Sequence, residues 1–250
     1  MQSCYHPRVI ADRWNDADAR ALSEPKLLLY RSHLLGADLA VTNFGGGNTS
    51  AKIAANDPIT GERVTVLWVK GSGDDLGSMG LSGFARLYQH KLLALENQFH
   101  GREHEDDLVP YFDYCAFAGS GRAASIDTPL HALLPFAHVD HVHPDSVIAI
   151  AAARRSESLA RQVFDGEVGW LAWQRPGFDL GLRLRDVVRA NPRIRGVVLA
   201  GHGLVTWGDT SKACYRNTIE TIRRAEEWLA ESIRAPAFGG VHIAARSSDE

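Results

Sequence analysis

RGVVLAGHGLVTWGDT, residues 195–210, predicts two short strands joined by a tight turn. Both runs are apolar and glycines bracket the connection, which is typical of a hairpin. His202 stands at the tip between Gly201 and Gly203, where glycine permits positive φ and close backbone approach. A histidine at such a tip is unusual for a residue of the hydrophobic core, which favours a functional role. The alternative interpretation is a turn in which the histidine has no function.

The rest of the chain mixes helical and strand-like segments without an internal repeat or a strict β-α-β alternation. Apolar spacing of three and four residues predicts helices at 12–35, 84–98, 179–190 and 211–234, and β-branched runs predict strands at 64–70, 139–144 and 168–177 with its loop. Residues 146–154 fit either state. The pattern predicts one α/β domain over residues 1–235, with a mixed or largely antiparallel sheet sandwiched by helices. Residues 236–250 are predicted to be a tail or linker, as in the front part of a longer protein.

Composition excludes several classes of protein. The 250 residues are 45% hydrophobic, which rules out intrinsic disorder, and the 27 basic and 30 acidic residues leave no basic excess for nucleic acid. Three cysteines without a C-x-x-C pair favour a reducing compartment. The N-terminus lacks the apolar region of a signal peptide, and no apolar run reaches the roughly 18 residues that span a bilayer. We therefore expect a cytoplasmic protein without a membrane or nucleic-acid partner.

The segment His141-Val142-His143-Pro144 places two histidines at alternate positions of a predicted strand. Alternate residues of a strand project to the same face, so both imidazoles can converge on one metal ion. The alternative is a pair of half-buried or surface histidines that bind no metal. Together with His202 they provide three imidazoles, the number of protein ligands that catalytic zinc commonly uses.

Two glycine-rich segments and one acidic residue could complete a site. Residues 45–50, GGGNTS, can form a nest of backbone N–H groups for an anion, or simply a flexible turn. Residues 71–77, GSGDDLG, match the dinucleotide spacing, but no helix is expected to open there and two aspartates would repel a pyrophosphate. A phosphomonoester at Ser72 and Gly73 is easier to accept. Asp127, at a predicted helix start, is either an N-cap or a general base.

Five motifs in order resemble the class II aldolase/adducin family: G-N-T-S at 47–50, K-G-S-G at 70–73, S-I-D at 125–127, H-V-H-P at 141–144 and H-G-L at 202–204. The match is specific because separate motifs agree in order and spacing over roughly residues 25–230. Within this family, the greatest resemblance is to the aldolase half of bacterial bifunctional rhamnulose-1-phosphate aldolase/short-chain dehydrogenase proteins. It is carried by the segments TNFGGGNTSAK, ASIDTPLHALLPF and WQRPGFDLG. In such a protein the tail would lead to a dehydrogenase domain that this chain lacks.

The resemblance implies a three-layer αβα sandwich with a mixed, mainly antiparallel central sheet, and a homotetramer with active sites at subunit interfaces. It implies Zn²⁺ as the cofactor, with the ligands His141, His143 and His202. It also implies a small-molecule sugar phosphate as the partner, with its phosphate bound by Gly47, Asn48, Ser72, Gly73 and Ser125.

The family's catalytic carboxylate falls on Asp127, where relatives usually carry the longer glutamate. The paired phosphate-binding serines of simpler aldolases correspond to Ala124 and Ser125, so one hydroxyl donor is missing. Lys70 adjoins a motif, and we expect it to be a phosphate-side or surface charge.

The resulting hypothesis is a zinc-dependent aldolase that cleaves a ketose 1-phosphate, with rhamnulose 1-phosphate favoured, to dihydroxyacetone phosphate and lactaldehyde. Asp127 would transfer the proton at carbon. Three alternatives stay open: a sugar-phosphate epimerase or dehydratase on the same scaffold, a non-catalytic adducin-like interaction domain, and part of a short-chain dehydrogenase-related protein.

Overall fold

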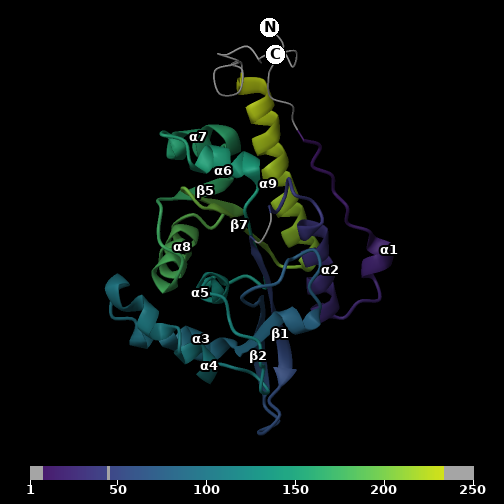
Figure 1. Cartoon of the computed structure of the whole chain (residues 1–250), viewed down its shortest axis with the longest axis vertical. Helices are drawn as coiled ribbons and strands as arrows, with labels where there is room; N and C mark the ends of the chain where they lie inside the picture. The colour runs from purple at the N-terminus through teal and green to yellow at the C-terminus, as the bar shows by residue number, and fades with distance from the viewer. Residues whose placement is uncertain (1–7, 44–45, 234–250) are drawn as a thin grey trace, which may run out of the picture.

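The computed structural model describes residues 8–43 and 46–233, which contain one seven-stranded sheet in the order β3-β2-β1-β4-β7-β6-β5 (Figure 1). Within the described residues only β5 and β6 pair in parallel, and every other neighbouring pair is antiparallel. The predicted mixed, mainly antiparallel sheet is confirmed. The strands are β1 (Asn48–Asn56), β2 (Arg63–Lys70), β3 (Phe84–Tyr88), β4 (His138–Val142), β5 (Val168–Leu171), β6 (Gly196–Leu199) and β7 (Gly203–Gly208).

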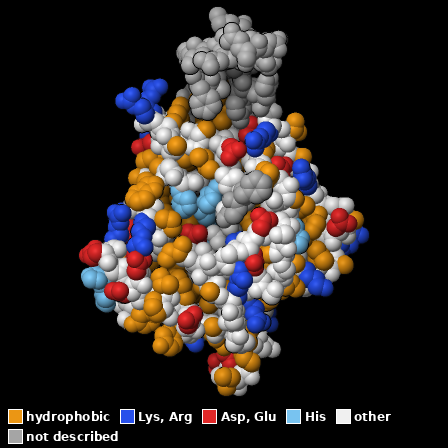
Figure 2. Space-filling view, in the orientation of Figure 1, with side chains coloured by type: hydrophobic (Ala, Val, Ile, Leu, Met, Phe, Trp, Pro, Cys, Tyr) orange, Lys and Arg blue, Asp and Glu red, His pale blue; other side chains and the backbone are white. Residues whose placement is uncertain are grey.

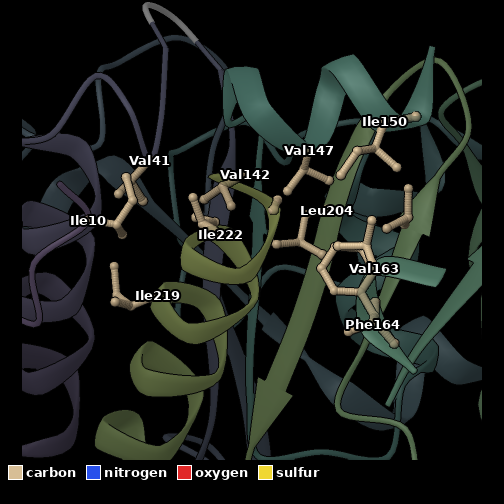
Figure 3. Packing of buried hydrophobic residues seen from close by; sticks show 14 of the residues in the cluster. Ile10, Val41, Val142, Val147, Ile150, Val163, Phe164, Leu204, Ile219 and Ile222 are labelled. Carbon is tan, nitrogen blue, oxygen red and sulfur yellow. The ribbon is translucent and has the colours of Figure 1, made fainter. Parts of the chain in front are cut away.

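Helices cover both faces of this sheet, as the three-layer prediction required. Alternate strand residues enter opposite cores: Val142 and Leu204 pack with one set of helices, while Val139 and Val205 pack with the other. Figure 3 shows the first core, where Ile222 lies beside Val142 and Ile219 packs in the same cluster. That face carries α2 (Glu24–Gly36), α6 (Asp145–Ala151), α7 (Ser156–Phe164) and α9 (Ser211–Ser232), and the other carries α3 (Gln89–Ala94), α5 (Thr128–Leu133) and α8 (Phe178–Ala190).

Short elements connect these layers. They are the helices α1 (Asp16–Ala19) and α4 (Tyr111–Tyr114) and the 3₁₀ turns η1 (Leu81–Gly83), η2 (Leu95–Gln98) and η3 (Arg102–Leu108). Within residues 71–83 the turn η1 is the one helical element, so no helix opens on the GSGDDLG segment and the rejection of a dinucleotide fingerprint is supported. The ambiguous segment 146–154 is mainly helical, as part of α6.

Two predicted helices were wrong in extent. The segment 84–98 begins as strand β3, because residues 84–88 pair with the edge of β2 in a register that runs from Lys70↔Phe84 to Val66↔Tyr88. The chain becomes helical only after Tyr88, as α3 and η2. The segment 12–35 divides into α1 and α2, and Pro25, which has no backbone N–H to donate, lies in the first turn of the second helix. The predicted tail 236–250 lies outside the described residues.

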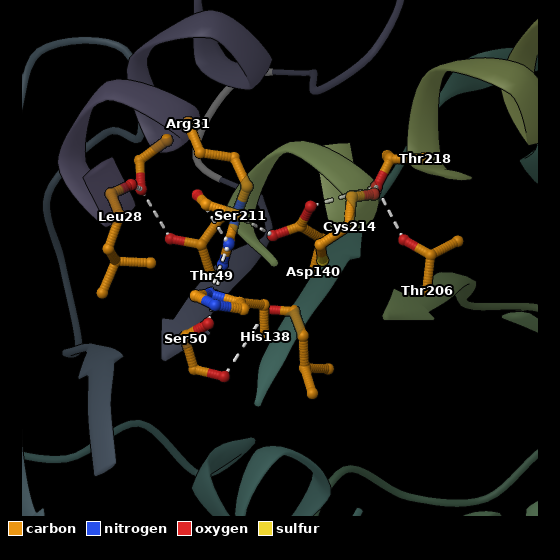
Figure 4. Close-up of polar contacts among 12 residues, drawn as sticks. Leu28, Arg31, Thr49, Ser50, His138, Asp140, Thr206, Ser211, Cys214 and Thr218 are labelled. Atoms are coloured by element: carbon orange, nitrogen blue, oxygen red, sulfur yellow. Dashed lines mark hydrogen bonds and ion pairs between the residues drawn. The ribbon is translucent and has the colours of Figure 1, made fainter. Parts of the chain in front are cut away.

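A buried polar network joins α2, β4 and α9 beneath the sheet (Figure 4). The guanidinium of Arg31 lies 2.9 Å from the carboxylate of Asp140, and both side chains are completely buried. Arg31 also donates to Nδ1 of His138 at 3.0 Å and to the Ser50 carbonyl at 2.7 Å, and Thr218 donates to Asp140 at 3.0 Å. This network ties the middle strand β4 to both helices of one layer.

Replacing His138 with glutamine is expected to make the protein less sensitive to acid. Burial and the Arg31 guanidinium lower the pKa of His138 to about 3, against an unfolded value of about 6.5. Between these values the unfolded chain binds a proton that the folded chain does not, so stability falls as the pH falls. His138→Gln should reduce the slope of unfolding free energy by up to about 1.4 kcal/mol per pH unit between pH 4 and 6.

Urea unfolding across that pH range measures the slope, and the exposed His100→Gln is the matched control because it changes one histidine without changing a buried one. Equal slopes for His138→Gln and the wild type would contradict the expectation.

Candidate active site

The three predicted ligand histidines converge on one point. Nε2 of His141, on β4, lies 3.0 Å from Nε2 of His143 and 3.2 Å from Nε2 of His202 at the β6–β7 turn. One ring nitrogen from each residue falls within 4.8 Å of the other two. We call these residues the histidine triad.

The donor geometry of the histidine triad fits a metal ion. The carbonyl of Leu204 can only accept, so Nδ1–H of His141 donates to it at 3.0 Å, and Nε2 keeps its lone pair for the shared point. Tetrahedral zinc with Zn–N bonds of about 2.0–2.1 Å places its ligand nitrogens about 3.3 Å apart. Two of the three separations in the triad are close to that value, and the residues fit a divalent cation.

Electrostatics keep the histidine triad in the form that a metal requires. Burial is the main cause that lowers the pKa of His141 and of His143 to about 3, and the neighbouring imidazoles add to it. Burial also lowers the pKa of His202, against the opposing effect of Asp127. The imidazoles are therefore neutral at physiological pH, and a ligand histidine must be neutral.

The glycines that flank His202 have distinct structural roles. Gly201 has φ +63°, which lets the chain turn directly before the histidine. A Cβ on Gly203 would lie 2.6 Å from Cδ2 of His143, so only glycine lets the two histidine-bearing segments approach this closely. The G-H-G pattern is thus explained by the close packing of the triad.

Asp127 occupies the N-cap position of α5 but does not act as a cap. Its side chain accepts no capping hydrogen bond, and its Oδ1 is buried without a partner. Ser125 instead accepts from the backbone N–H of Asp127 at 3.2 Å. Burial raises the pKa of Asp127, while His202 and His143 oppose that rise. The interpretation of Asp127 as a plain N-cap is therefore wrong, and a half-buried carboxyl group with one buried, unpartnered oxygen lies near the triad.

One cavity of about 510 Å³ brings the predicted phosphate-binding residues together with Asp127 and His143. Figure 2 shows histidine side chains gathered at a hollow on this side of the molecule, next to acidic ones. The β1–β4 pairing places Asn48 opposite His141, which brings the first glycine-rich segment beside the histidine triad. We call this the site cavity, and its lining includes Gly47, Asn48, Ser72, Gly73, Ser125, Asp127 and His143.

Several residues around the site cavity were not among the site residues predicted from the sequence. Of the two positions expected for Lys70, the surface one is wrong: Lys70 is buried and lines the site cavity beside the predicted phosphate-binding loop, and its Nζ donates to the Gly73 carbonyl at 2.7 Å. Burial lowers the pKa of Lys70. Arg122 reaches the same loop from the segment before α5 and pairs with Asp74 at 2.8 Å. Trp173 is 56% exposed, and its ring lies beside Gly201 at the triad's turn. The contacts of Arg122 and Trp173 join distant segments, so local spacing could not reveal them.

Comparison with known proteins agrees with this geometry. The family model described as Class II Aldolase and Adducin N-terminal domain matches residues 27–229. The chain belongs to the class II aldolase and adducin family. A solved class II aldolase domain of a conserved protein from Thermoplasma acidophilum is 30% identical, with a TM-score of 0.76 over 92% of this chain and 99% of that one. An L-fuculose-1-phosphate aldolase from Thermus thermophilus shares the fold, with 15% identity and a TM-score of 0.53 over 87% of this chain and 96% of that one.

A curated relative is much longer than this class II aldolase and adducin domain. The chain is 39% identical over 214 residues to a Bacillus subtilis protein called uncharacterized oxidoreductase YuxG, which covers 85% of this chain. The chain spans only 31% of the length of that relative. In the described residues, no helix combines the length and apolar character needed to cross a membrane.

Proposed function

We propose that this domain is a zinc-dependent aldolase that cleaves a ketose 1-phosphate, with L-rhamnulose 1-phosphate favoured, to dihydroxyacetone phosphate and lactaldehyde. The observation that carries the proposal is that His143 of the histidine triad, the unpartnered carboxyl oxygen of Asp127 and the glycine-rich loops meet at one cavity. An adducin-like scaffold would have no use for three neutral imidazoles whose nitrogens meet at one point. We expect His141, His143 and His202 to hold the ion.

The chain's own residues have separable roles in this reaction. A bound Zn²⁺ would supply Lewis-acid stabilisation of negative charge on the substrate oxygens. Asp127, with its raised pKa and free Oδ1, is suited to hold and release a proton at the substrate carbon. Gly47, Asn48, Ser72, Gly73 and Ser125 would bind the phosphate and orient the sugar without reacting.

The decisive experiment is cleavage of L-rhamnulose 1-phosphate by the purified chain, followed through dihydroxyacetone phosphate in a coupled assay. Release that chelator abolishes and Zn²⁺ restores would support both the metal and the reaction. Metal bound without cleavage would transfer the proposal to another sugar phosphate or to an epimerase, which product analysis identifies. If the protein neither binds metal nor cleaves the substrate, the enzymatic proposal is overturned.

Replacing Asp127 with asparagine is expected to lower kcat by about 10²–10⁴-fold, the usual contribution of a positioned acid or base. Metal content should stay at the wild-type value, since no hydrogen bond from Asp127 holds the triad in place. Asp113→Asn, an exposed aspartate on α4, is the control for the same chemical change. Unchanged kcat in Asp127→Asn would remove Asp127 from the mechanism.

The longer context is also part of the proposal. We assign no hydride transfer to this domain, because no helix begins in the GSGDDLG loop. The oxidoreductase name belongs to a relative about three times as long.

By analogy with the family we propose a cytoplasmic homotetramer, and the buried free thiols of Cys115 and Cys214 are consistent with a reducing compartment. Sedimentation equilibrium measures the assembly, and a monomer at micromolar concentration would contradict it.

A further inference from the structure

The peptide unit between Ser72 and Gly73 is held from one side. The Ser72 carbonyl accepts a hydrogen bond from the guanidinium of Arg122. Because the C=O and N–H of a trans peptide point in opposite directions, the N–H of Gly73 points away from Arg122. Within the described residues the backbone N–H groups of Gly73, Asp74 and Asp75 donate to no protein acceptor. The loop therefore carries free donors beside the site cavity.

Arg122 lies behind this loop and not in the site cavity. Its side chain lines a second cavity of about 460 Å³, together with Trp68 and Arg86. It packs so closely on the loop that a Cβ on Gly71 would lie 2.6 Å from Cγ of Arg122. Gly71, Ser72 and Gly73 line the site cavity on their other side. The loop is thus a thin wall between the guanidinium and the proposed phosphate position.

Arg122 also neutralises an unfavourable charge. Asp74 follows Gly73 and has φ +40°, an uncommon conformation for a residue other than glycine. Its carboxylate would repel a phosphate, but the guanidinium of Arg122 pairs with it at 2.8 Å. One side chain thus holds the Ser72 carbonyl and the neighbouring carboxylate together.

The same residue links the two halves of the phosphate site. Arg122 stands three residues before Ser125, and the N–H of Ser72 donates to the Ala123 carbonyl at 3.2 Å. The loop at 71–75 and the segment that leads into α5 are therefore joined by a backbone bond and by the Arg122 side chain. A substitution at Arg122 should therefore displace the phosphate donors of the loop 71–75 and also Ser125.

We propose that Arg122 is a positioning residue of an anion subsite: it fixes the Ser72–Gly73 peptide with its N–H toward the site cavity and cancels the charge of Asp74, so that the loop accepts a phosphate dianion. The proposal rests on the proposed function in naming a phosphomonoester as the ligand. It concerns phosphate binding and not carbon–carbon cleavage, so the two can fail separately.

The test is binding of inorganic phosphate to the purified chain, measured by isothermal titration calorimetry. Arg122→Ala is expected to weaken binding by about tenfold, which is about 1.4 kcal/mol, because the N–H of Gly73 is no longer held toward the phosphate. The matched control is Arg86→Ala, which removes the same charge from the same second cavity; the guanidinium of Arg86 stacks over the ring of Trp68. If both variants lose phosphate affinity equally, the loss is due to the change in net charge alone, and the proposal is overturned.

A double variant separates positioning from charge cancellation. Arg122→Ala with Asp74→Asn restores the local charge balance but leaves the Ser72 carbonyl unheld, and asparagine tolerates the positive φ. We expect binding to stay close to that of Arg122→Ala. Full recovery would show that Arg122 acts through charge alone and would overturn the positioning role.

Two further measurements keep the outcomes distinguishable. Metal content of Arg122→Ala should match the wild type, because Arg122 contacts no member of the histidine triad. Thermal unfolding should change little, because the side chain of Arg122 is partly exposed. Loss of metal together with a large fall in the unfolding temperature would mean a merely structural role and would overturn the proposal. With a sugar phosphate that is cleaved, KM should rise while kcat changes little. Phosphate binding with the expected ranking but no cleavage counts against the proposed function alone, whereas absent phosphate binding in the wild type overturns this inference.

Discussion

Replacing His141 with alanine is expected to abolish stoichiometric metal binding and to lower the aldolase rate by about 10³-fold or more. His141 is the shared member of both short nitrogen–nitrogen contacts in the histidine triad, at 3.0 and 3.2 Å. Lewis-acid stabilisation is worth several kcal/mol, and each 1.36 kcal/mol is tenfold in rate. Metal analysis of the dialysed protein and the coupled cleavage assay measure the two effects.

His141 is fully buried, so a second variant guards against misfolding. His202→Ala removes a proposed ligand from the partly exposed turn without opening the sheet, and this variant should lose metal in the same way. The exposed His100→Ala is the control and should retain both metal and activity. Full metal occupancy in His141→Ala and His202→Ala would show that the ion is held elsewhere.

Replacing Asp140 with alanine is expected to lower the free energy of unfolding by about 3–5 kcal/mol, the usual cost of leaving one partner of a buried ion pair alone. The guanidinium of Arg31 would then remain in a completely buried position, with His138, Ser211 and the Ser50 carbonyl as its contacts. Arg31→Met, which isolates the carboxylate, should cost a similar amount. Urea unfolding measures both.

Two comparisons make this stability prediction specific. Glu157→Ala breaks the exposed pair with Arg161, whose side chains are 49% and 74% exposed, and should cost less than about 1 kcal/mol. The double variant Arg31→Met with Asp140→Leu removes both charges and should recover much of the loss. A cost below about 1 kcal/mol for Asp140→Ala would show that the buried pair contributes little.

Regular local patterns accounted for much of the fold and of the candidate site. The hairpin at 195–210, the strand at 64–70 and the long helix after residue 210 follow from apolar spacing and turn glycines, which act between near neighbours. The helix expected over 84–98 failed for the opposite reason. Residues 84–88 pair with β2, and hydrogen bonds to a separate strand outweigh the helical preference of the segment.

Residue types and their order, by themselves, indicated which groups could form a site. The H-x-H spacing on a strand places two imidazoles on one face, and the G-H-G turn supplies a third, so those residues were predictable from backbone geometry. Only the tertiary structure decided that Asp127 leaves the helix end uncapped with a free buried oxygen, and that Lys70 is buried against the loop. It also decided that Arg122 braces that loop from behind and that Arg31 and Asp140 form a buried pair. The contacts of Arg122 and Arg31 join segments far apart in the chain. Burial in the folded protein isolates the Asp127 oxygen and lowers the pKa of Lys70. Neither long-range contacts nor burial is encoded in local spacing.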